Sequence, residues 1–394
     1  MAEATQTKTT IAIDPVTRIE GHLKAEVVVE NGKVVDAKLT GGMYRGFESI
    51  LRGRHPRDAA QIVQRICGVC PTAHATAASI ALEKASGTAV PSNGRATRNL
   101  ILGANYLQSH ILHFYHLAGQ DFIQGPDTAP FMPRYAKPDL RLPPAINAVG
   151  VDQYVEALEV RAVCHEMVAL FGGRMPHVHG ILAGGAAEIP TKEKLVEYAA
   201  RFKKVRKFVE EKYLPVVYLV GSQYKDLGAF GQGYRNALCV GVFPLDDEGK
   251  EFVFKAGAYQ DGKDMPFDVK RVTEDVKFSW FADSTSGKPF TKGENVLEVD
   301  KKGAYSFVKA PLYNGKPMEV GPLARMWVNN KPISPIGQKL FKEYFGLDVK
   351  NFRDMGEDLA FSLLGRHVAR AEESYLMLDV VERFLKEALD DVQH

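Results

Sequence analysis

The chain has 394 residues, of which 45% are hydrophobic and 25% charged, the balance of an ordinary soluble globular protein. A formal net charge of +2 gives no reason to expect binding to nucleic acid, and no apolar run reaches the roughly 20 residues of a membrane-spanning helix. The N-terminus lacks the basic stretch and apolar core of a signal peptide, and four cysteines are too few for a disulfide scaffold.

The N-terminal part of the chain has the pattern of β-structure. Residues 11–40 include alternating apolar and polar side chains, and Asn31-Gly32 interrupts them. Asn-Gly is a strong hairpin signal because both residues accept positive φ. We therefore expect a β-rich hairpin unit over residues 1–45.

Helical patterns dominate the rest. Apolar residues recur at the spacing of one helix face over 100–122, after the predicted N-cap Thr191, and over 357–389, whereas short strands and turns alternate over 236–310. The predicted fold class is mainly α: a buried helical bundle core with a β-rich N-terminal hairpin unit and a β-rich insertion, folding as one cooperative domain. The predicted pieces are a β unit over 1–45, a helical metal-binding core over 46–235, a β-rich insertion over 236–310 and a helical C-terminal part over 311–394.

The sharpest chemical feature is the segment Arg65-Ile-Cys-Gly-Val-Cys-Pro-Thr-Ala-His74. Cys67 and Cys70 can point two thiolates at one metal, and we expect Gly68 to let the backbone turn tightly between them. Thiolates select soft or borderline metals such as nickel, iron and zinc. Spacing alone leaves three interpretations open: a structural zinc site, which normally needs two more ligands at comparable spacing, a thioredoxin-like dithiol, which needs a βαβ setting, and a redox metal site.

Further motifs make the chain resemble the large subunit of nickel–iron hydrogenases. The cysteine segment carries that family's Arg-x-Cys-Gly-x-Cys signature followed by a histidine. The other matches, in the family's order and spacing, are Asp14-Pro-Val-Thr-Arg-Ile-Glu-Gly-His22, Gly41-Gly-Met-Tyr-Arg-Gly-Phe-Glu48, Ser109-His-Ile-Leu-His-Phe-Tyr-His-Leu117, Glu319-Val-Gly-Pro-Leu-Ala-Arg325 and Gly365-Arg-His-Val-Ala-Arg370. Arg45-Gly-Phe-Glu48 and Cys70-Pro-Thr-Ala-His74 look closest to the periplasmic nickel–iron–selenium branch.

The resemblance implies reversible heterolytic cleavage of dihydrogen. Cys67 would bind nickel alone, and Cys70 would bridge nickel to an iron that carries carbon monoxide and cyanide ligands. Heterolytic cleavage needs a polarising metal for the hydride and a base beside it for the proton. The alternative function is a non-catalytic structural or assembly homologue, like the related subunit of respiratory complex I, which lacks the cysteine pair.

Two carboxylates match further functional positions of the family. Glu20 matches the proton gate that accepts the proton leaving the site, and its alternative role is a salt bridge to Arg18. Glu48 matches a ligand of a magnesium or iron ion. In the family this ion occupies a site near the C-terminus, on the path that protons take. The alternative role of Glu48 is a carboxylate at a helix start that pairs with Arg45 or Arg52.

Three residues around the cysteines also take roles from the resemblance. His74 matches a histidine that donates a hydrogen bond to the bridging thiolate, with a satisfied core histidine as the alternative. Apart from the resemblance, the neighbouring Arg65 and His74 could stabilise the negative charge of the thiolates. Val69 and Leu117 match positions that narrow the gas channel at the metal, although both would be ordinary packing residues otherwise.

His110, His113 and His116 recur every third residue, which invites a metal interpretation. A helix turns about 100° per residue, so the three side chains do not share one face. We expect structural or proton-path roles for them. Cys164 and Cys239 are expected to be small core residues.

The sequence departs from the family in one respect. The family completes its site with a second pair in an Asp-Pro-Cys-x-x-Cys setting, with selenocysteine at the first position in the selenium branch, whereas the only Asp-Pro here is Asp14-Pro15. Two thiolates cannot hold a four-thiolate dinuclear centre. We therefore expect the chain to be C-terminally incomplete, inactive by itself, and to expose apolar surface where the absent segment would pack.

The resemblance also implies partners. Electrons would leave through an iron–sulfur small subunit, because the cysteines here could not hold a cluster, and then reach an acceptor such as a c-type cytochrome. The heterodimer would be exported to the periplasm by the partner's signal, with membrane association as an option and a cytoplasmic location as the alternative.

Overall fold

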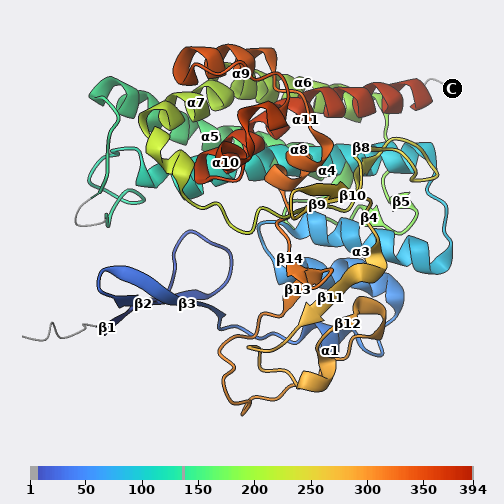
Figure 1. Cartoon of the computed structure of the whole chain (residues 1–394). Helices are drawn as coiled ribbons and strands as arrows, with labels where there is room; N and C mark the ends of the chain where they lie inside the picture. Colours follow the sequence, from blue (N-terminus) through green and yellow to red (C-terminus); the bar gives the residue numbers. More distant parts are fainter. Residues whose placement is uncertain (1–7, 135–137, 393–394) are drawn as a thin grey trace, which may run out of the picture. The chain divides into compact units, whose positions relative to one another are not determined.

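The computed structural model describes residues 8–134 and 138–392 (Figure 1). Its contacts divide the chain into two compact units, each assembled from segments distant in sequence. Unit 1 comprises Met1–Arg52 and Asp268–Met318, and unit 2 comprises Gly53–Phe267 and Glu319–His394. The segment 236–310, expected to be one β-rich insertion, is thus shared between the units.

Unit 2 is built around long helices that lie side by side (Figure 1). The central one, α4 (Ser92–Leu112), packs against α5 (Pro144–Gly172) on one side and α11 (Leu363–Val392) on another. Helix α4 has buried residues on nearly all of its faces, as expected of a helix in the middle of a bundle. The fold class is therefore mainly α, as predicted.

Shorter elements complete unit 2. These are α2 (Ala59–Ile62), α3 (Pro71–Ser86), α6 (Lys192–Phe208), α7 (Leu214–Gln223), α8 (Pro322–Asn329), α9 (Pro335–Leu340) and α10 (Glu357–Ala360). The predicted N-cap of α6 is confirmed, because the Thr191 hydroxyl accepts a hydrogen bond from the Lys194 amide at 3.3 Å.

The predicted helix over 100–122 changes its winding before it ends. After Leu112 the chain continues as a wider π-helical turn over His113–Ala118, then as a short 3₁₀ turn over Gly119–Asp121. A π-helical turn inside a helix redirects the side chains that follow it. Leu117 lies in this turn, which packs against α5.

The strands of unit 2 form small antiparallel sheets. One three-stranded sheet has the order β10-β9-β6, and two further pairs are β4-β5 and β7-β8. Their bounds are β4 (Ile181–Leu182), β5 (Gly185–Ala186), β6 (Ala237–Cys239), β7 (Val242–Pro244), β8 (Phe252–Phe254), β9 (Gly257–Gln260) and β10 (Lys263–Met265).

Unit 1 holds the predicted hairpin. Strands β1 (Lys8–Ile13), β2 (Leu23–Glu30) and β3 (Lys33–Gly41) form one antiparallel sheet, and Asn31 and Gly32 make the β2–β3 turn with φ of 52° and 75°. The hairpin is therefore confirmed. A second sheet has the order β12-β11-β13-β14, and unit 1 also contains α1 (Phe47–Leu51). Its strands are β11 (Val272–Asp275), β12 (Lys288–Pro289), β13 (Ala310–Tyr313) and β14 (Lys316–Pro317).

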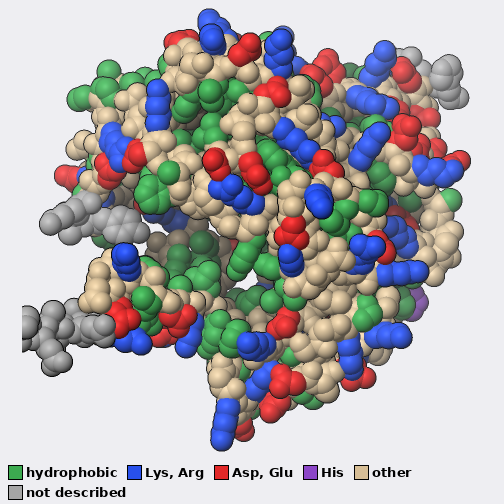
Figure 2. Space-filling view, viewed as in Figure 1, with side chains coloured by type: hydrophobic (Ala, Val, Ile, Leu, Met, Phe, Trp, Pro, Cys, Tyr) green, Lys and Arg blue, Asp and Glu red, His purple; other side chains and the backbone are tan. Residues whose placement is uncertain are grey.

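Acidic and basic side chains are intermingled over the visible face, without a large area of one sign (Figure 2). This agrees with the small net charge of the chain. Within residues 8–134 and 138–392, none of the helices combines the length and apolar character of a membrane span.

Candidate metal centre

The two clustered cysteines lie at the start of helix α3 in unit 2. Cys67 follows a 3₁₀ turn over Val63–Ile66, and Cys70 is the N-cap residue of the 16-residue α3. The Cys70 amide donates a hydrogen bond to the Cys67 sulfur at 3.1 Å, which closes the turn between them. The positive end of the helix dipole favours negative charge at this position, so the local structure suits thiolates.

The two thiols differ in access. Cys67 is buried, with 6% of its surface exposed, whereas Cys70 is half-buried. The pair therefore offers one sheltered sulfur and one that is more accessible. This arrangement fits a ligand pair facing a bound metal better than a fully buried packing role.

Gly68 does not act as the sequence suggested. Its φ is not positive, and an added Cβ would meet no atom of the described residues within 4 Å. The turn between the cysteines is made by the hydrogen bond from the Cys70 amide to Cys67, not by the freedom of glycine.

His74 and Arg65 flank the pair on either side. His74 is half-buried one helical turn into α3, and burial lowers the pKa of its imidazole, which is therefore neutral near pH 7. Arg65 is exposed, and its guanidinium donates to the Gln61 carbonyl at 2.6 Å. Val69 and Leu117 are both half-buried, the first in the cysteine turn and the second in the π-helical turn.

The three regularly spaced histidines point to different partners, as predicted. His110 contacts the Glu373 carboxylate at 2.7 Å, His113 packs on the ring of His367 with centroids 5.6 Å apart, and His116 lies 3.3 Å from the Tyr154 carbonyl. Burial lowers the pKa of His113 to about 3 and that of His116 to about 4.

Among the described residues, no group of three or more His, Cys, Asp or Glu side chains could hold a metal ion.

Two of the sequence motifs contain residues of ion pairs that the sequence did not reveal, one largely buried and one half-buried. Arg325 donates to both oxygens of Glu373, one at 2.8 Å, and Arg366 donates to both oxygens of Glu319 at 2.7 Å. Burial alone would raise the pKa of Glu373, but Arg325 and His110 hold it at about 2. The motifs Glu319–Arg325 and Gly365–Arg370 thus contain residues that hold the helical core together.

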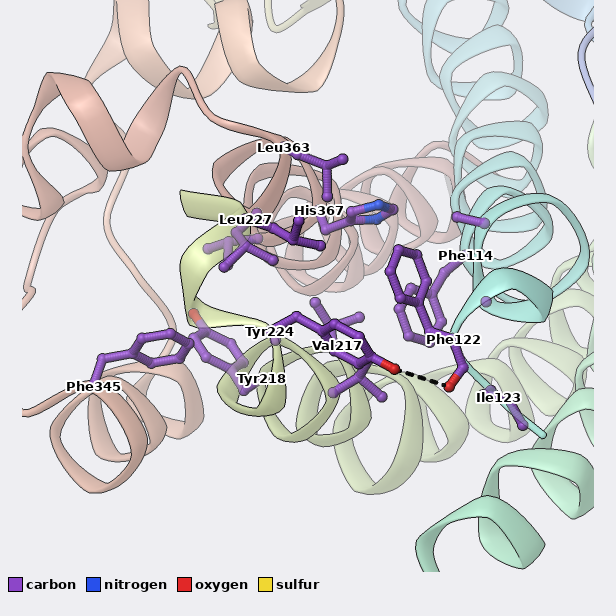
Figure 3. Close-up of a pocket in the computed structure, with 16 residues that line it drawn as sticks. Phe114, Phe122, Ile123, Val217, Tyr218, Tyr224, Leu227, Phe345, Leu363 and His367 are labelled. Carbon is purple, nitrogen blue, oxygen red and sulfur yellow. Dashed lines mark hydrogen bonds between the residues drawn. The ribbon is translucent and has the colours of Figure 1, made fainter. Parts of the chain in front are cut away.

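A small apolar cavity of about 40 Å³ lies inside unit 2, between the end of the α4 segment, α7 and α11 (Figure 3). The Tyr224 hydroxyl donates to the Phe122 carbonyl at 3.4 Å at its edge (Figure 3). The cavity is also lined by Phe114, Ala118, Val217 and His367.

The other two cysteines, Cys164 and Cys239, are buried core residues, as expected.

The two predicted carboxylates lie in unit 1. Glu20 is exposed in a bend before β2. Glu48 is in the first turn of α1 and lines a polar hollow of about 380 Å³ together with Arg45, Glu274 and Lys309. Lys309 donates to Glu274 at 3.2 Å, so the hollow contains two carboxylates, of which Glu274 is paired with a lysine ammonium.

Comparison with known proteins places these features in context. The nickel-dependent hydrogenase family model matches residues 45–127 and 120–394, and a model described as HoxL-like matches residues 10–40. The chain is 59% identical over 389 residues to the periplasmic [NiFeSe] hydrogenase large subunit of Desulfomicrobium baculatum, covering 96% of this chain and 76% of that protein. It is 33% identical over 383 residues to the hydrogenase-2 large chain of Escherichia coli K12, covering 81% and 67%.

Solved structures of hydrogenases resemble the fold of this chain. The chain superposes on the Ni-Fe-Se hydrogenase of D. vulgaris Hildenborough with a TM-score of 0.95 and 70% identity, covering 97% of this chain and 79% of that one. The [NiFeSe] hydrogenase of Dm. baculatum gives a TM-score of 0.94 at 60% identity, covering 97% and 80%.

Proposed function

Because this chain belongs to the nickel-dependent hydrogenase family and is a large subunit of its nickel–iron–selenium branch, we propose that Cys67 and Cys70 ligate the nickel–iron centre at which dihydrogen is reversibly cleaved. The observation that carries the proposal is the paired placement of the two sulfurs at the N-terminus of α3. Thiolates in a partly sheltered site suit soft transition metals.

The donor set fits the proposed centre. Cys67, the sheltered thiol, and Cys70, the more accessible one, would hold the nickel and an iron that carries carbon monoxide and cyanide ligands. When bound, this centre supplies the polarisation that splits dihydrogen unevenly. His74 is neutral and lies on the same helix as Cys70, so it can donate one N–H to the sulfur.

Protons and a second cation are assigned to unit 1. Glu20 would accept the proton that leaves the site, and Glu48, which lines the polar hollow of unit 1, would be a ligand of the magnesium or iron ion. Val69 and Leu117 limit gas access, and Arg65 stabilises the thiolate charge. These roles rest on the motif matches and on the residue types.

Electrons need a way out of the large subunit. Large subunits of hydrogenases pair with small subunits, and we assign to the partner the iron–sulfur clusters and delivery to an acceptor such as a c-type cytochrome. The relative from Dm. baculatum is named periplasmic, which supports a periplasmic location for this chain.

Metal analysis tests the proposal. In the nickel-loaded enzyme that contains its partner, Cys67→Ser is expected to abolish stoichiometric nickel, whereas Cys239→Ser, in a buried core cysteine of β6, is expected to retain it. Nickel retained at full stoichiometry in Cys67→Ser would contradict the assignment. The expectation that the 394-residue chain by itself turns over no dihydrogen is checked by dihydrogen uptake on the purified chain.

A further inference from the structure

Gln64 lies three positions before Cys67 and is completely buried, with 0% of its surface exposed. Its backbone carbonyl accepts a hydrogen bond from the Cys67 amide at 3.4 Å. Its side-chain nitrogen donates to the Ala60 carbonyl at 2.9 Å and to the Val178 carbonyl at 2.9 Å. The same residue therefore touches the cysteine turn through its backbone and a distant loop through its side chain.

The orientation of the Gln64 amide is determined by these contacts. Both groups that face Nε2 are carbonyl oxygens, which can only accept, so the nitrogen and not the oxygen must point at them. Among the described residues, no donor reaches Gln64 Oε1, although that atom is buried. The two hydrogen bonds of Nε2 are therefore the contacts that hold the Gln64 side chain in place.

The loop that receives Gln64 is itself firmly held. It follows α5, and the amides of His179 and Gly180 both donate to the Gly172 carbonyl, at 2.8 and 3.1 Å. A Cβ at Gly180 would lie 2.3 Å from the Phe171 carbonyl oxygen, so the loop closes tightly on the end of the helix. The Val178 carbonyl is therefore a fixed point on the helical core.

A second contact joins the same loop to the other side of the cysteine pair. The Thr72 hydroxyl, in the first turn of α3, donates to the Met175 sulfur at 3.7 Å. The cysteine turn is thus attached to the loop after α5 both before Cys67 and after Cys70. The Gln61 side chain, in α2, also donates to the Val178 carbonyl, at the longer distance of 3.5 Å. Of these three contacts, only that of Gln64 is made by the 3₁₀ turn that leads directly into Cys67.

We propose that Gln64 is a positioning residue for Cys67, whose amide ties the turn before the cysteine to the Val178 carbonyl and so keeps the thiol sheltered and correctly directed before any metal binds. A ligand held in place beforehand loses less entropy on binding, which favours loading of the metal. The significance of this role rests on the proposed function of Cys67, but the contacts do not depend on it.

Thiol accessibility tests the proposal without any metal. The metal-free 394-residue chain is treated with iodoacetamide for timed intervals, and the alkylation of each cysteine is followed by peptide mass spectrometry. In Gln64→Leu, which keeps the volume but removes the donor, alkylation of Cys67 is expected to become about tenfold faster, since one buried polar link between two segments is lost. The rate at Cys164, in the core of α5, is expected to stay unchanged.

Gln108→Leu is the matched control. Gln108 is also a glutamine with 0% exposure and a buried Oε1 that no donor reaches among the described residues, but its nitrogen contacts only Asn105 and Ser109 of its own helix. This variant is expected to leave the Cys67 rate at the wild-type value. An equal acceleration of Cys67 in both variants, or no acceleration in Gln64→Leu, would overturn the proposal.

Gln64→Met covers the case in which Gln64→Leu does not fold, because methionine adapts its shape to the site and also lacks the donor. Equally faster alkylation of Cys67, Cys164 and Cys239 would indicate a general loosening of the fold. Loss of folding in both variants would indicate that Gln64 has a general structural role. Either result would overturn the proposal. The result is independent of nickel, so a failure of nickel loading in the wild-type protein would count against the proposed function alone.

Discussion

Glu373 lies inside the helical core as a carboxylate with no exposed surface, between His110 on α4 and Arg325 on α8. Removing one member of a buried pair leaves the other charge without compensation. We therefore expect Glu373→Gln to lower the free energy of unfolding by about 3 kcal/mol, measured by urea denaturation. Replacing both members, as in Arg325→Met with Glu373→Met, is expected to be less damaging than the single change.

The same carboxylate gives a pH signature. Its folded pKa of about 2 lies below its ordinary value of 4.5, so its contribution to stability is complete above pH 4.5 and declines as the pH falls towards 2. The difference in unfolding free energy between the wild type and Glu373→Gln should therefore narrow over that window. A difference that stays constant from pH 5 to pH 2.5 would show that the charge of Glu373 does not stabilise the core.

Among single residues, the sequence revealed the close cysteine pair but not the ion pairs of the core. The Cys67 and Cys70 pair could be found because the two cysteines belong to one turn and are neighbours in the chain. The pairing of Arg325 with Glu373 could not be found, because it joins positions separated by 48 residues and depends on how α8 meets α11.

Elements specified by local sequence were predicted well. The β2–β3 hairpin depends on Asn31 and Gly32 accepting positive φ, and the start of α6 depends on the Thr191 side chain, so both follow from neighbouring residues. The π-helical turn at His113–Ala118 was not predicted, since apolar spacing does not distinguish it from a continuing α-helix. The sharing of 236–310 between the units depends on contacts distant in sequence.

The close approach of α4 and α11 depends on Gly103. An added Cβ there would lie 2.7 Å from Cγ2 of Val381, nearer than side-chain carbons pack. We expect Gly103→Ala to destabilise the chain by about 1–3 kcal/mol, because overpacking outweighs the better helix propensity of alanine. Thermal unfolding followed by circular dichroism measures the effect.

Gly221→Ala provides the matched control for that substitution. Gly221 is in α7, and its Cβ would meet Cζ of Phe345 at 3.7 Å, an ordinary contact. The substitution is expected to be neutral or to stabilise by up to about 1 kcal/mol through helix propensity. Equal effects of the two changes would refute close packing as the reason for Gly103.

For the chain as a whole, the class of fold followed from the amino-acid sequence. Which segments of the chain form each of the two units did not follow from it. A mainly helical chain with small sheets was predicted from periodicity and from motif order, and it was confirmed by the match to the Ni-Fe-Se hydrogenase structures. Each unit, however, combines two segments that are separated in the chain, by Gly53–Phe267 in unit 1 and by Asp268–Met318 in unit 2, and no local pattern reveals this.

The proposed reaction assigns metal binding to Cys67 and Cys70 in unit 2 and proton acceptance to Glu20 in unit 1. In the complete nickel-loaded enzyme, Glu20→Gln is expected to slow the exchange of deuterium between dihydrogen gas and water at least about a hundredfold, within the range for loss of a proton-transfer group. The nickel content is expected to stay at the wild-type level. The control is Glu26→Gln, since Glu26 lies in the same unit on β2 and pairs with Lys24 at 3.3 Å. Exchange measured by mass spectrometry should be unaffected in that variant. Normal exchange in Glu20→Gln would remove Glu20 from the proton path, whereas loss of nickel together with exchange would assign it a role in assembling the site.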